Sequence, residues 1–510
     1  MTAPWQSVPE ELNAPYKRKE AVIIRADAAE ASAPQLELDP AEPLSAARQF
    51  VGRHFTTATG LRTLQHHAGA FYQWNGRCYE PADLQSIRSK LYSILEAAKR
   101  RDKKGDLVPF KPTMARVTNV VDAIQAVANL HNTVRAPAWL ANPDGRRLAG
   151  ELVACANGLL HLATGDLLDT TPAFFSLNAL DFAFDPDAPP AAEWLQFLAS
   201  LWGDDVEAIE TLQEWCGYCL TTDTRQQKIF LVVGPKRSGK GTIARVLTKL
   251  LGQLNVCGPT LASLGQTFGL APLIGKQLAI ISDARLGGRA DQQVIAERLL
   301  SISGEDGITI DRKFIEPWTG TLSTRFMIMT NELPEIADAS GAFASRFIVL
   351  TMQRSFFGNE DHGLTARLLD ELPGILNWAI EGWRRLQERG YFRQPASSAE
   401  AIQELEDLSS PVGAFLRERC ETGPGLEVPC ALLFAHWRVW CEDQGRDYPG
   451  NVQVFGRKLK AACRAIKTTQ LRVDGERERR YEGVGIRADI PLNVTVRAEA
   501  KLAAMEEGAK

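Results

Sequence analysis

The 510-residue chain lacks any apolar run of the roughly 20 residues that a membrane-spanning helix needs. Its first residues also lack the basic-then-apolar pattern of a secretory signal. Both absences predict a soluble, cytoplasmic protein with no membrane partner. The net charge of −4 argues against a protein that coats nucleic acid by bulk electrostatics, so any DNA contact must come from local basic elements.

Cysteine is scarce: nine residues form no dense framework, and an odd number fits reduced thiols inside a cell. Cys216 and Cys219 have thioredoxin-type spacing, but they lie in a segment of helical period, whereas redox chemistry needs a strand-to-helix setting. No second pair at ligand spacing supports a zinc site. The chain also shows no Asp-x-Asp and His grouping for the two metals of primer synthesis, so we do not expect primase activity.

The most informative segment is an apolar strand, residues 229–233, that runs into a glycine-rich loop followed by a helix. Such a loop turns its N–H groups inward as an anion nest, its lysine adds charge for the outer phosphates, and the helix start points at them. The segment therefore predicts ATP binding, and the alternative is a turn that binds nothing. The predicted phosphate-loop residues are Gly234, Pro235, Lys236, Arg237, Ser238, Gly239, Lys240, Gly241 and Thr242.

Two further strands end in polar residues suited to ATP chemistry. Asp283 follows the apolar run 278–281 and is expected to hold Mg²⁺, while Asn331 follows 326–329 and is expected to sense the outer phosphate. The carboxyl ends of parallel strands form one crevice, so these residues can converge, although a lone Asp or Asn after a strand is commonly a turn residue or helix cap. Gly241 stands where a metal-binding hydroxyl is usual, which leaves Thr242 as the candidate second magnesium ligand.

Residues 307–318 have the pattern of a hairpin tipped by Arg312, Lys313 and Phe314. Charge and an aromatic ring at such a tip suit a grip on single-stranded DNA, and a solvated turn is the alternative. Arg346 directly precedes the apolar strand 347–350, as an arginine finger acting on a neighbouring subunit would. That role predicts a ring, and a structural surface arginine is the other interpretation.

Composition and periodicity divide the chain into a flexible segment (1–45), an α+β region (46–222), an α/β ATPase core (223–390) and a C-terminal region (411–490), with a linker of Ser, Ala and Glu character at 395–410. The basic run 99–104 is expected to be a charged helix end. The C-terminal region has helices followed by a hairpin, as in a winged helix, and its cations suit either duplex DNA or protein contact. These cations are Arg457, Lys458, Lys460, Arg464, Lys467, Arg472, Arg477, Arg479 and Arg480.

Together, residues 234–242, 281–283, 303–313, 330–334 and 340–346 resemble the superfamily 3 helicase core of the poxvirus- and phage-type primase-helicases. Residues 50–222 are similar to that family's N-terminal helicase-associated region, and 411–487 to its winged-helix extension. The resemblance implies an AAA+-like P-loop ATPase that forms a homohexamer and uses ATP and Mg²⁺ to move along single-stranded DNA in phage, prophage or plasmid replication, with a separate primase as a further partner.

By the family pattern, Lys240 binds phosphate, Asp283 holds Mg²⁺, Asn331 is the sensor, Arg346 is the finger and Lys313 contacts DNA. Gly241 and Ser282 depart from the pattern, and the catalytic base stays unassigned. Two other functions stay open. The first is a small-molecule P-loop kinase, because Gly-Lys-Gly-Thr is also the ending that such enzymes use. The second is a DNA-binding replication initiator without motor activity. ATPase stimulation by single-stranded DNA separates these functions.

Overall fold

The computed structural model describes residues 36–140, 147–282, 289–313, 315–334, 342–446, 449–473 and 476–507. The chain forms two compact units, one made of residues up to 54 with 83–127 and the other of 55–82 with the rest. Most of the expected flexible segment 1–45 lies outside the described residues, although the first helix begins within it, at Pro43. None of the described helices is both long and apolar enough to cross a bilayer.

The first unit packs three helices around a small apolar core, because Ile87, Leu91 and Leu95 recur at helical spacing and are all buried. Its basic run lies on a short antiparallel hairpin, in which Arg100 pairs with Val108, so the expectation of a charged helix end was wrong. The elements are α1 (Pro43–His54), α2 (Leu84–Ala97), β4 (Lys99–Arg101), β5 (Leu107–Pro109) and α3 (Met114–Val127).

The second unit begins with short antiparallel sheets. The expected hairpin around an Asn-Gly turn is present: Trp74 pairs with Tyr79, and the Asn75 carboxamide oxygen accepts hydrogen bonds from the N–H groups of Arg77 and Cys78. These sheets comprise β1 (Leu64–His67), β2 (Ala70–Trp74), β3 (Tyr79–Pro81), β6 (Ala138–Trp139), β7 (Leu152–Cys155), β8 (Gly158–His161), β9 (Leu167–Leu168) and β10 (Phe174–Phe175).

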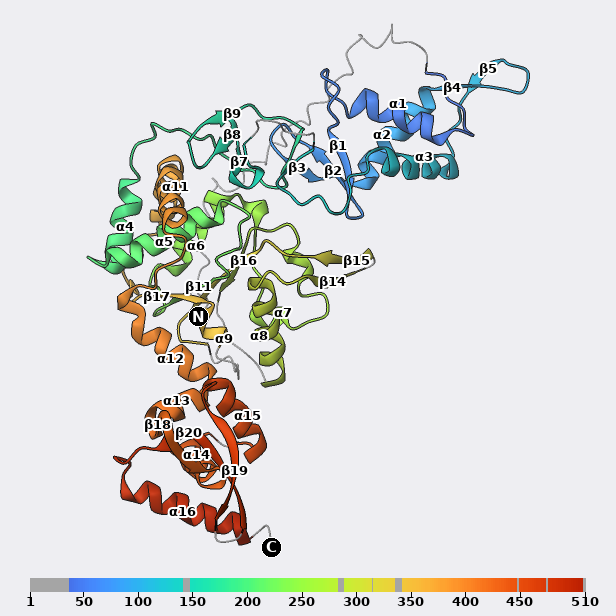
Figure 1. Ribbon diagram of the computed structural model, residues 1–510. Coiled ribbons are helices and arrows are strands. Elements are labelled where there is room, and N and C mark those ends of the chain that lie inside the picture. Colours follow the sequence, from blue (N-terminus) through green and yellow to red (C-terminus); the bar gives the residue numbers. More distant parts are fainter. Residues whose placement is uncertain are drawn as a thin grey trace, which may run out of the picture. The chain divides into compact units, whose positions relative to one another are not determined.

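A five-stranded, wholly parallel sheet forms the centre of this unit, in the order β12-β13-β16-β11-β17 (Figure 1). The mixed α/β class with a parallel sheet is thus confirmed. Strand β11, which leads into the glycine-rich loop, lies between two strands that follow it late in the sequence. The strands are β11 (Ile229–Val233), β12 (Val256–Cys257), β13 (Leu278–Ser282), β16 (Arg325–Thr330) and β17 (Phe347–Thr351).

Helices cover both faces of the sheet, which explains why its strands are apolar runs with no alternation. Phe230 and Val232 face one helical layer, whereas Ile229 and Leu231 face the other. The first layer contains α4 (Ala192–Trp202), α5 (Val206–Cys219), α6 (Lys240–Leu251), α10 (Leu364–Asp370) and α11 (Leu372–Arg389); the second contains α7 (Leu261–Leu264), α8 (Arg289–Ser303) and α9 (Ala342–Ser345).

Helices α5 and α11 are held together by close backbone approach and by buried charge. A Cβ added at Gly217 would lie 2.1 Å from the carbonyl oxygen of Ala379, so only glycine fits there. Glu214, buried on α5, accepts hydrogen bonds from Arg385 (2.8 Å) and Arg389 (3.0 Å) on α11. This pair of helices is therefore a fixed layer behind the sheet.

The expected linker at 395–410 is largely a helix, α12 (Ala399–Ser409), so that prediction was wrong. Leu405 is fully buried against the second helical layer, and the buried Ser398 hydroxyl accepts a hydrogen bond from the N–H of Thr351 at the end of β17. Ser, Ala and Glu are compatible with a helix as well as a linker, and the burial of Leu405 decides between them.

The C-terminal region consists of helices around the antiparallel sheet β18-β20-β19. The expected hairpin is confirmed in register from Lys467–Glu482 to Val473–Glu476, and its turn, 474–475, lies outside the described residues. Strand β18 and the last helix were not predicted. The elements are α13 (Pro411–Arg419), β18 (Cys420–Pro429), α14 (Cys430–Asp443), α15 (Val452–Ala462), β19 (Lys467–Val473), β20 (Glu476–Ile486) and α16 (Leu492–Glu507).

Candidate nucleotide-binding site

The glycine-rich loop leaves the carboxyl end of β11 and folds tightly before α6 begins. Gly239, the residue before the helix, has φ 95°, in the left-handed region that favours glycine. At Gly234 a Cβ would lie 2.7 Å from the Cβ of Met352, so the loop must also be glycine there. Because the first N–H groups of a helix have no partner within it, the start of α6 offers donors to an anion.

Lys240 extends from the first turn of α6 back over the loop. Its ammonium group donates to the carbonyl oxygens of Gly234 (2.6 Å) and Pro235 (2.9 Å) and to the Ser238 hydroxyl (3.2 Å). Burial lowers the pKa of Lys240 from its ordinary value. All of these partners are neutral, so the lysine charge is not cancelled by a carboxylate and is available to a phosphate.

Asn331 lies beside Lys240, as the sequence predicts. Strand β16 pairs in parallel with β11, Val233 opposite Thr330, so the residues that follow the two strands emerge at one edge of the sheet. The Asn331 carboxamide oxygen accepts a hydrogen bond from the Lys240 ammonium (3.3 Å), and the side chain is exposed. The structure therefore brings these two predicted site residues together.

The expected magnesium ligand Asp283 lies outside the described residues. Ser282, the residue before it, ends β13 at the same edge of the sheet, opposite Met329 of β16. Ser282 therefore marks the carboxyl end of β13 at the edge of the sheet from which the glycine-rich loop leaves.

Thr242, the other expected magnesium ligand, has its hydroxyl engaged. Arg245, one turn further along α6, donates a hydrogen bond to it (3.1 Å). A guanidinium group this close opposes a divalent cation at the same oxygen. At Gly241, by contrast, an added Cβ would meet only the Arg245 guanidinium, at 3.5 Å, so a larger side chain has room there.

The loop forms one wall of an open cleft of about 900 Å³. The opposite wall comes from the segment after β17, which is bound to the loop: Phe356 donates its N–H to the Arg237 carbonyl oxygen (2.9 Å), and the Arg237 guanidinium lies 3.3 Å from the Glu360 carboxylate. A nucleotide-sized ligand fits such a volume. Arg245 and Glu360 line the cleft but were not predicted. Arg245 was detectable from its i, i+3 spacing to Thr242, whereas no local signal marks Glu360.

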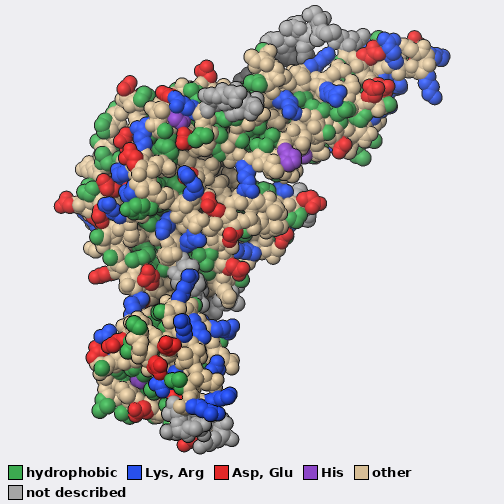
Figure 2. Space-filling model, in the orientation of Figure 1, with side chains coloured by type: hydrophobic (Ala, Val, Ile, Leu, Met, Phe, Trp, Pro, Cys, Tyr) green, Lys and Arg blue, Asp and Glu red, His purple; other side chains and the backbone are tan. Residues whose placement is uncertain are grey.

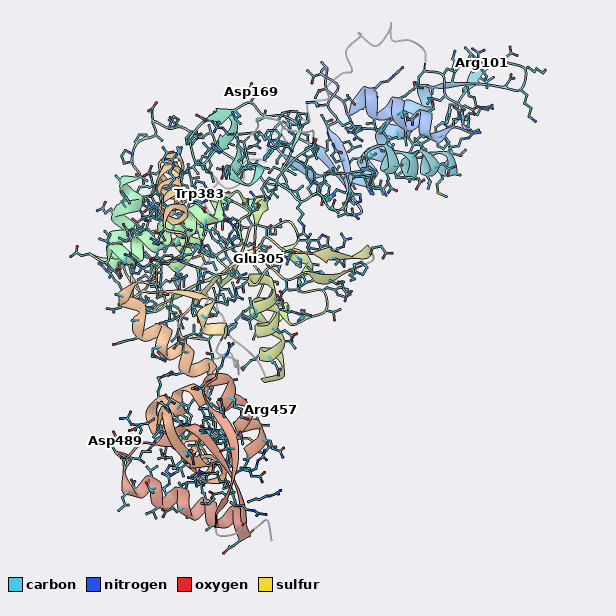
Figure 3. All side chains as sticks on the ribbon, viewed as in Figure 1. Arg101, Asp169, Glu305, Trp383, Arg457 and Asp489 are labelled. Carbon is cyan, nitrogen blue, oxygen red and sulfur yellow. The ribbon has the colours of Figure 1, made fainter. Side chains whose placement is uncertain are left out.

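Arg346 lies at the other edge of the sheet. Its carbonyl oxygen accepts the N–H of Ile229 (2.7 Å), at the amino end of β11, so about five residues of strand, roughly 16 Å, separate it from the loop. Its guanidinium donates to the Gln227 carboxamide oxygen, and the Gln227 amide nitrogen lies 3.5 Å from Glu305, which Figure 3 labels. Thr224 donates its hydroxyl to the same Glu305 carboxylate (2.5 Å). The structure therefore does not bring Arg346 to Lys240 within one chain.

The hairpin expected around 307–318 is present as β14 (Ile308–Arg312) and β15 (Ile315–Gly320), which project from the second helical layer (Figure 1). Ile310 is buried and anchors it. Arg312 donates from Nε to the Glu316 carbonyl oxygen (2.9 Å) and Lys313 is exposed, while Phe314 lies outside the described residues.

Among the described residues, no cluster of His, Cys, Asp or Glu has the arrangement of a metal site. Cys216 and Cys219 lie on α5 in the core, and burial raises the pKa of Cys219 to about 12. All nine cysteines are free thiols.

Two family models match parts of the chain. Residues 52–203 match the family described as D5 N terminal like, and residues 232–346 match a family of unknown function, DUF5906. The second match includes every residue predicted for the ATPase site, from Gly234 to Arg346.

Curated proteins match over shorter segments. The DNA-binding protein RFX2 of Mus musculus is 23% identical over 129 residues, which cover 23% of this chain and 18% of that protein. The MHC class II regulatory factor RFX1 of Homo sapiens is 25% identical over 96 residues, which cover 19% of this chain and 10% of that protein. The chain thus spans less than a fifth of the length of these relatives.

Among solved structures, an apo form of the C-terminal region of NrS-1 covers 87% of this chain and 100% of its own, with 12% identity and a TM-score of 0.48. A second apo structure of that region, residues 305–718, has 14% identity and a TM-score of 0.45 over 87% of this chain and 99% of its own. At these scores the likeness supports no functional conclusion.

Proposed function

We propose that this chain is an ATP-dependent DNA helicase of the phage-type primase-helicase group, related to superfamily 3, that acts in replication of a phage, prophage or plasmid. One observation carries the proposal. A glycine-rich loop, a lysine with only neutral partners and a polar residue from a second strand converge at one edge of a parallel sheet, next to a cleft that suits a nucleotide. Ligands bind at this edge in open α/β sheets.

Within one subunit, the residues divide the work of holding a triphosphate. The N–H groups of the loop and of the first turn of α6 bind phosphate oxygens, and Lys240 exchanges its carbonyl partners for phosphate. Asn331, already in contact with Lys240, is positioned to orient the attacked phosphate or the water. Bound Mg²⁺ neutralises phosphate charge, and in this proposal Asp283 holds it, since the Thr242 hydroxyl is bonded to Arg245.

Arg346 is proposed to act on the nucleotide of a neighbouring subunit. In its own chain it lies at the opposite edge of the sheet, and its described contact is with neutral Gln227. An arginine that stabilises charge on the transferring phosphate must reach the nucleotide site. In a ring of subunits, each chain would supply this arginine to the site of its neighbour, and the resemblance implies that the ring is a homohexamer. This geometry does not serve a monomeric kinase.

The comparisons support the proposal in part. The D5-like match covers the region that resembles the helicase-associated segment, and one of the relatives, RFX2, is a DNA-binding protein by name. The order α13-β18-α14-α15-β19-β20, with β20 central in its sheet, is that of a winged helix. We assign the C-terminal region to that class.

The test is ATP hydrolysis by the purified chain with and without single-stranded DNA. Wild type is expected to turn over ATP faster with the DNA, and Lys240→Ala to lose at least about a hundredfold in turnover. A kinase predicts no stimulation by DNA, and an initiator without a motor predicts DNA binding with no hydrolysis in either protein. Either result contradicts the proposal.

Mixing two inactive variants tests the ring. Arg346→Ala is expected to lower turnover about a thousandfold. In mixed rings, a Lys240→Ala subunit supplies an intact Arg346 to the intact nucleotide site of an Arg346→Ala subunit, so activity should reappear. Failure to recover activity while both variants assemble would exclude the arrangement across subunits.

A further inference from the structure

The described part of the C-terminal region carries a concentrated positive charge on one side. Between Pro449 and Val473 the sequence has no Asp or Glu. Lys and Arg side chains gather over the α15 side of this region (Figure 2). Arg457 lies on that side, and Asp489 lies on the opposite side (Figure 3). We call this surface the α15 face, and it consists of the exposed residues Arg457, Lys460, Arg464 and Arg479.

Several acidic residues of the region pair with cations outside the α15 face. Glu442 and Asp443, at the end of α14, pair with Arg497 on α16 (3.2 and 2.7 Å), and Glu442 also pairs with Lys501. Arg480 takes up the charge of Glu427 and Glu478 on the sheet. Among the residues with described side chains, none of the four cations of the α15 face forms an ion pair. Their charge therefore stays available to a ligand.

Helix α15 and strand β20 meet at a close contact, so their cations form one surface. A Cβ at Gly456 would lie 2.4 Å from the Tyr481 hydroxyl, which shows how closely the strand approaches the helix. Arg479 is two residues from Tyr481 and so shares its face of β20. The charges of Lys460 and Arg479 both lower the pKa of the Cys430 thiol, so both side chains lie near Cys430.

The α15 face offers charge without aromatic rings. Phe455 and Tyr481, the aromatic residues of α15 and the hairpin, are only 1% and 4% exposed. Proteins that bind single strands stack bases on exposed rings, whereas an α-helix or β-ribbon with free cations suits the grooves and phosphates of a duplex. On α15, the exposed Arg457 and Lys460 are three residues apart and so lie on one side of the helix, and the exposed Arg464 follows in the turn after it.

We propose that the α15 face binds double-stranded DNA, with Lys460 and Arg479 contacting phosphates at its centre. The sequence left duplex binding and protein contact open, and the unneutralised charge and buried rings favour duplex. B-form DNA is the fitting partner because its major groove admits a helix, whereas the corresponding groove of duplex RNA is too narrow. This site is separate from the ATPase cleft and does not depend on the proposed motor activity.

The experiment measures binding of the full chain to a labelled DNA duplex and to a single strand of the same length, without nucleotide, over a salt series. Lys460→Ala/Arg479→Ala is expected to weaken duplex binding about tenfold and to reduce the slope of log affinity against log salt by about 2. The matched control, Arg497→Ala/Lys501→Ala, removes two charges that already have carboxylate partners. It should leave duplex affinity unchanged.

Equal duplex binding by wild type and the Lys460/Arg479 variant would overturn the proposal. So would an equal loss in both double variants, since that identifies net charge rather than this surface, and so would an equal loss for single strand and duplex. Thermal unfolding checks that both variants fold. Lys240→Ala should keep duplex binding, so failure of the motor and failure of this site are separate results.

Discussion

The two edges of the five-stranded sheet carry similar polar side chains but organise them differently. At the carboxyl edge, Lys240 holds main-chain carbonyl oxygens and Asn331 beside an open cleft. At the amino edge, Arg346, Gln227, Glu305 and Thr224 form a continuous chain of contacts. The first edge offers an uncancelled positive charge beside a cleft, and the second holds an arginine about a strand's length away from it.

The difference teaches how one sheet can supply the two halves of a composite site. In a parallel sheet, the loops that follow the strands all lie at one edge, and the loops that precede them all lie at the other. Residues before and after a strand are therefore separated by the length of that strand. A single chain therefore does not bring Arg346 to its own Lys240, and in the ring that we propose a neighbouring copy would supply it. The following predictions test the two edges and the helical layer behind them.

The largest effect is expected from Gly217→Ala, which breaks the support of the amino edge. The new Cβ would lie 2.1 Å from the Ala379 carbonyl oxygen, so α5 must move away from α11. We expect the free energy of unfolding to fall by about 3 kcal/mol, measured by chemical denaturation. The control is Gly241→Ala, because a Cβ at Gly241 has room in the cleft. This change should alter the free energy of unfolding by no more than about 0.5 kcal/mol.

Gln227→Ala tests whether Arg346 must be held in place. Loss of the carboxamide frees the guanidinium, so kcat for ATP hydrolysis should fall about tenfold while the KM for ATP stays unchanged. Gln226→Ala is the matched control, because its carboxamide donates instead to the Gly390 carbonyl oxygen.

The Gln227→Ala variant should also regain activity when it is mixed with Lys240→Ala, as we expect for Arg346→Ala. A rise in KM without a change in kcat would show that Gln227 serves its own nucleotide site instead, and the contrast between the two edges would be lost.

Gly241→Ser tests the magnesium ligands at the carboxyl edge. A serine there adds a hydroxyl at the position usual in phosphate loops, and there is room for it. We expect the Mg²⁺ concentration for half-maximal ATP hydrolysis to fall about fivefold, equivalent to about 1 kcal/mol. Gly241→Ala separates the hydroxyl from the added carbon. If serine and alanine behave alike, Gly241 is not at a metal position.

The smallest effect concerns the buried thiols of α5, behind both edges. Burial raises the pKa of Cys216 and Cys219, for Cys219 to about 12, so neither forms thiolate near pH 8. Alkylation followed by mass spectrometry should leave both unmodified in the folded protein and modify both in denaturant. Partly exposed Cys463 is the internal control. Rapid modification of Cys216 in the folded protein would mean that α5 opens.

Much of the carboxyl edge was predictable from sequence because its signals are local. Apolar runs such as 278–281 and 326–329 are strands in the structure, and the spacing from Gly234 to Lys240 places a tight loop between strand and helix. Asn331 was found because a polar residue after a buried strand is a local pattern. Helix α12 was missed although its Ala, Glu and Leu residues favour a helix, because the surrounding Ser and Pro residues are typical of a linker. Strand β18 was missed because its Gly and Pro residues disfavour a strand, which forms here by pairing with β20.

The sequence by itself determined the apolar strands of the central sheet, where the glycine-rich loop lies and which residues carry charge, since these depend on neighbours along the chain. Only the tertiary structure decided that Asn331 reaches Lys240, that Arg346 lies at the far edge and that the cations of the α15 face keep their charge. These outcomes depend on strand order and on which side chains meet across long sequence separations, and no local pattern encodes them.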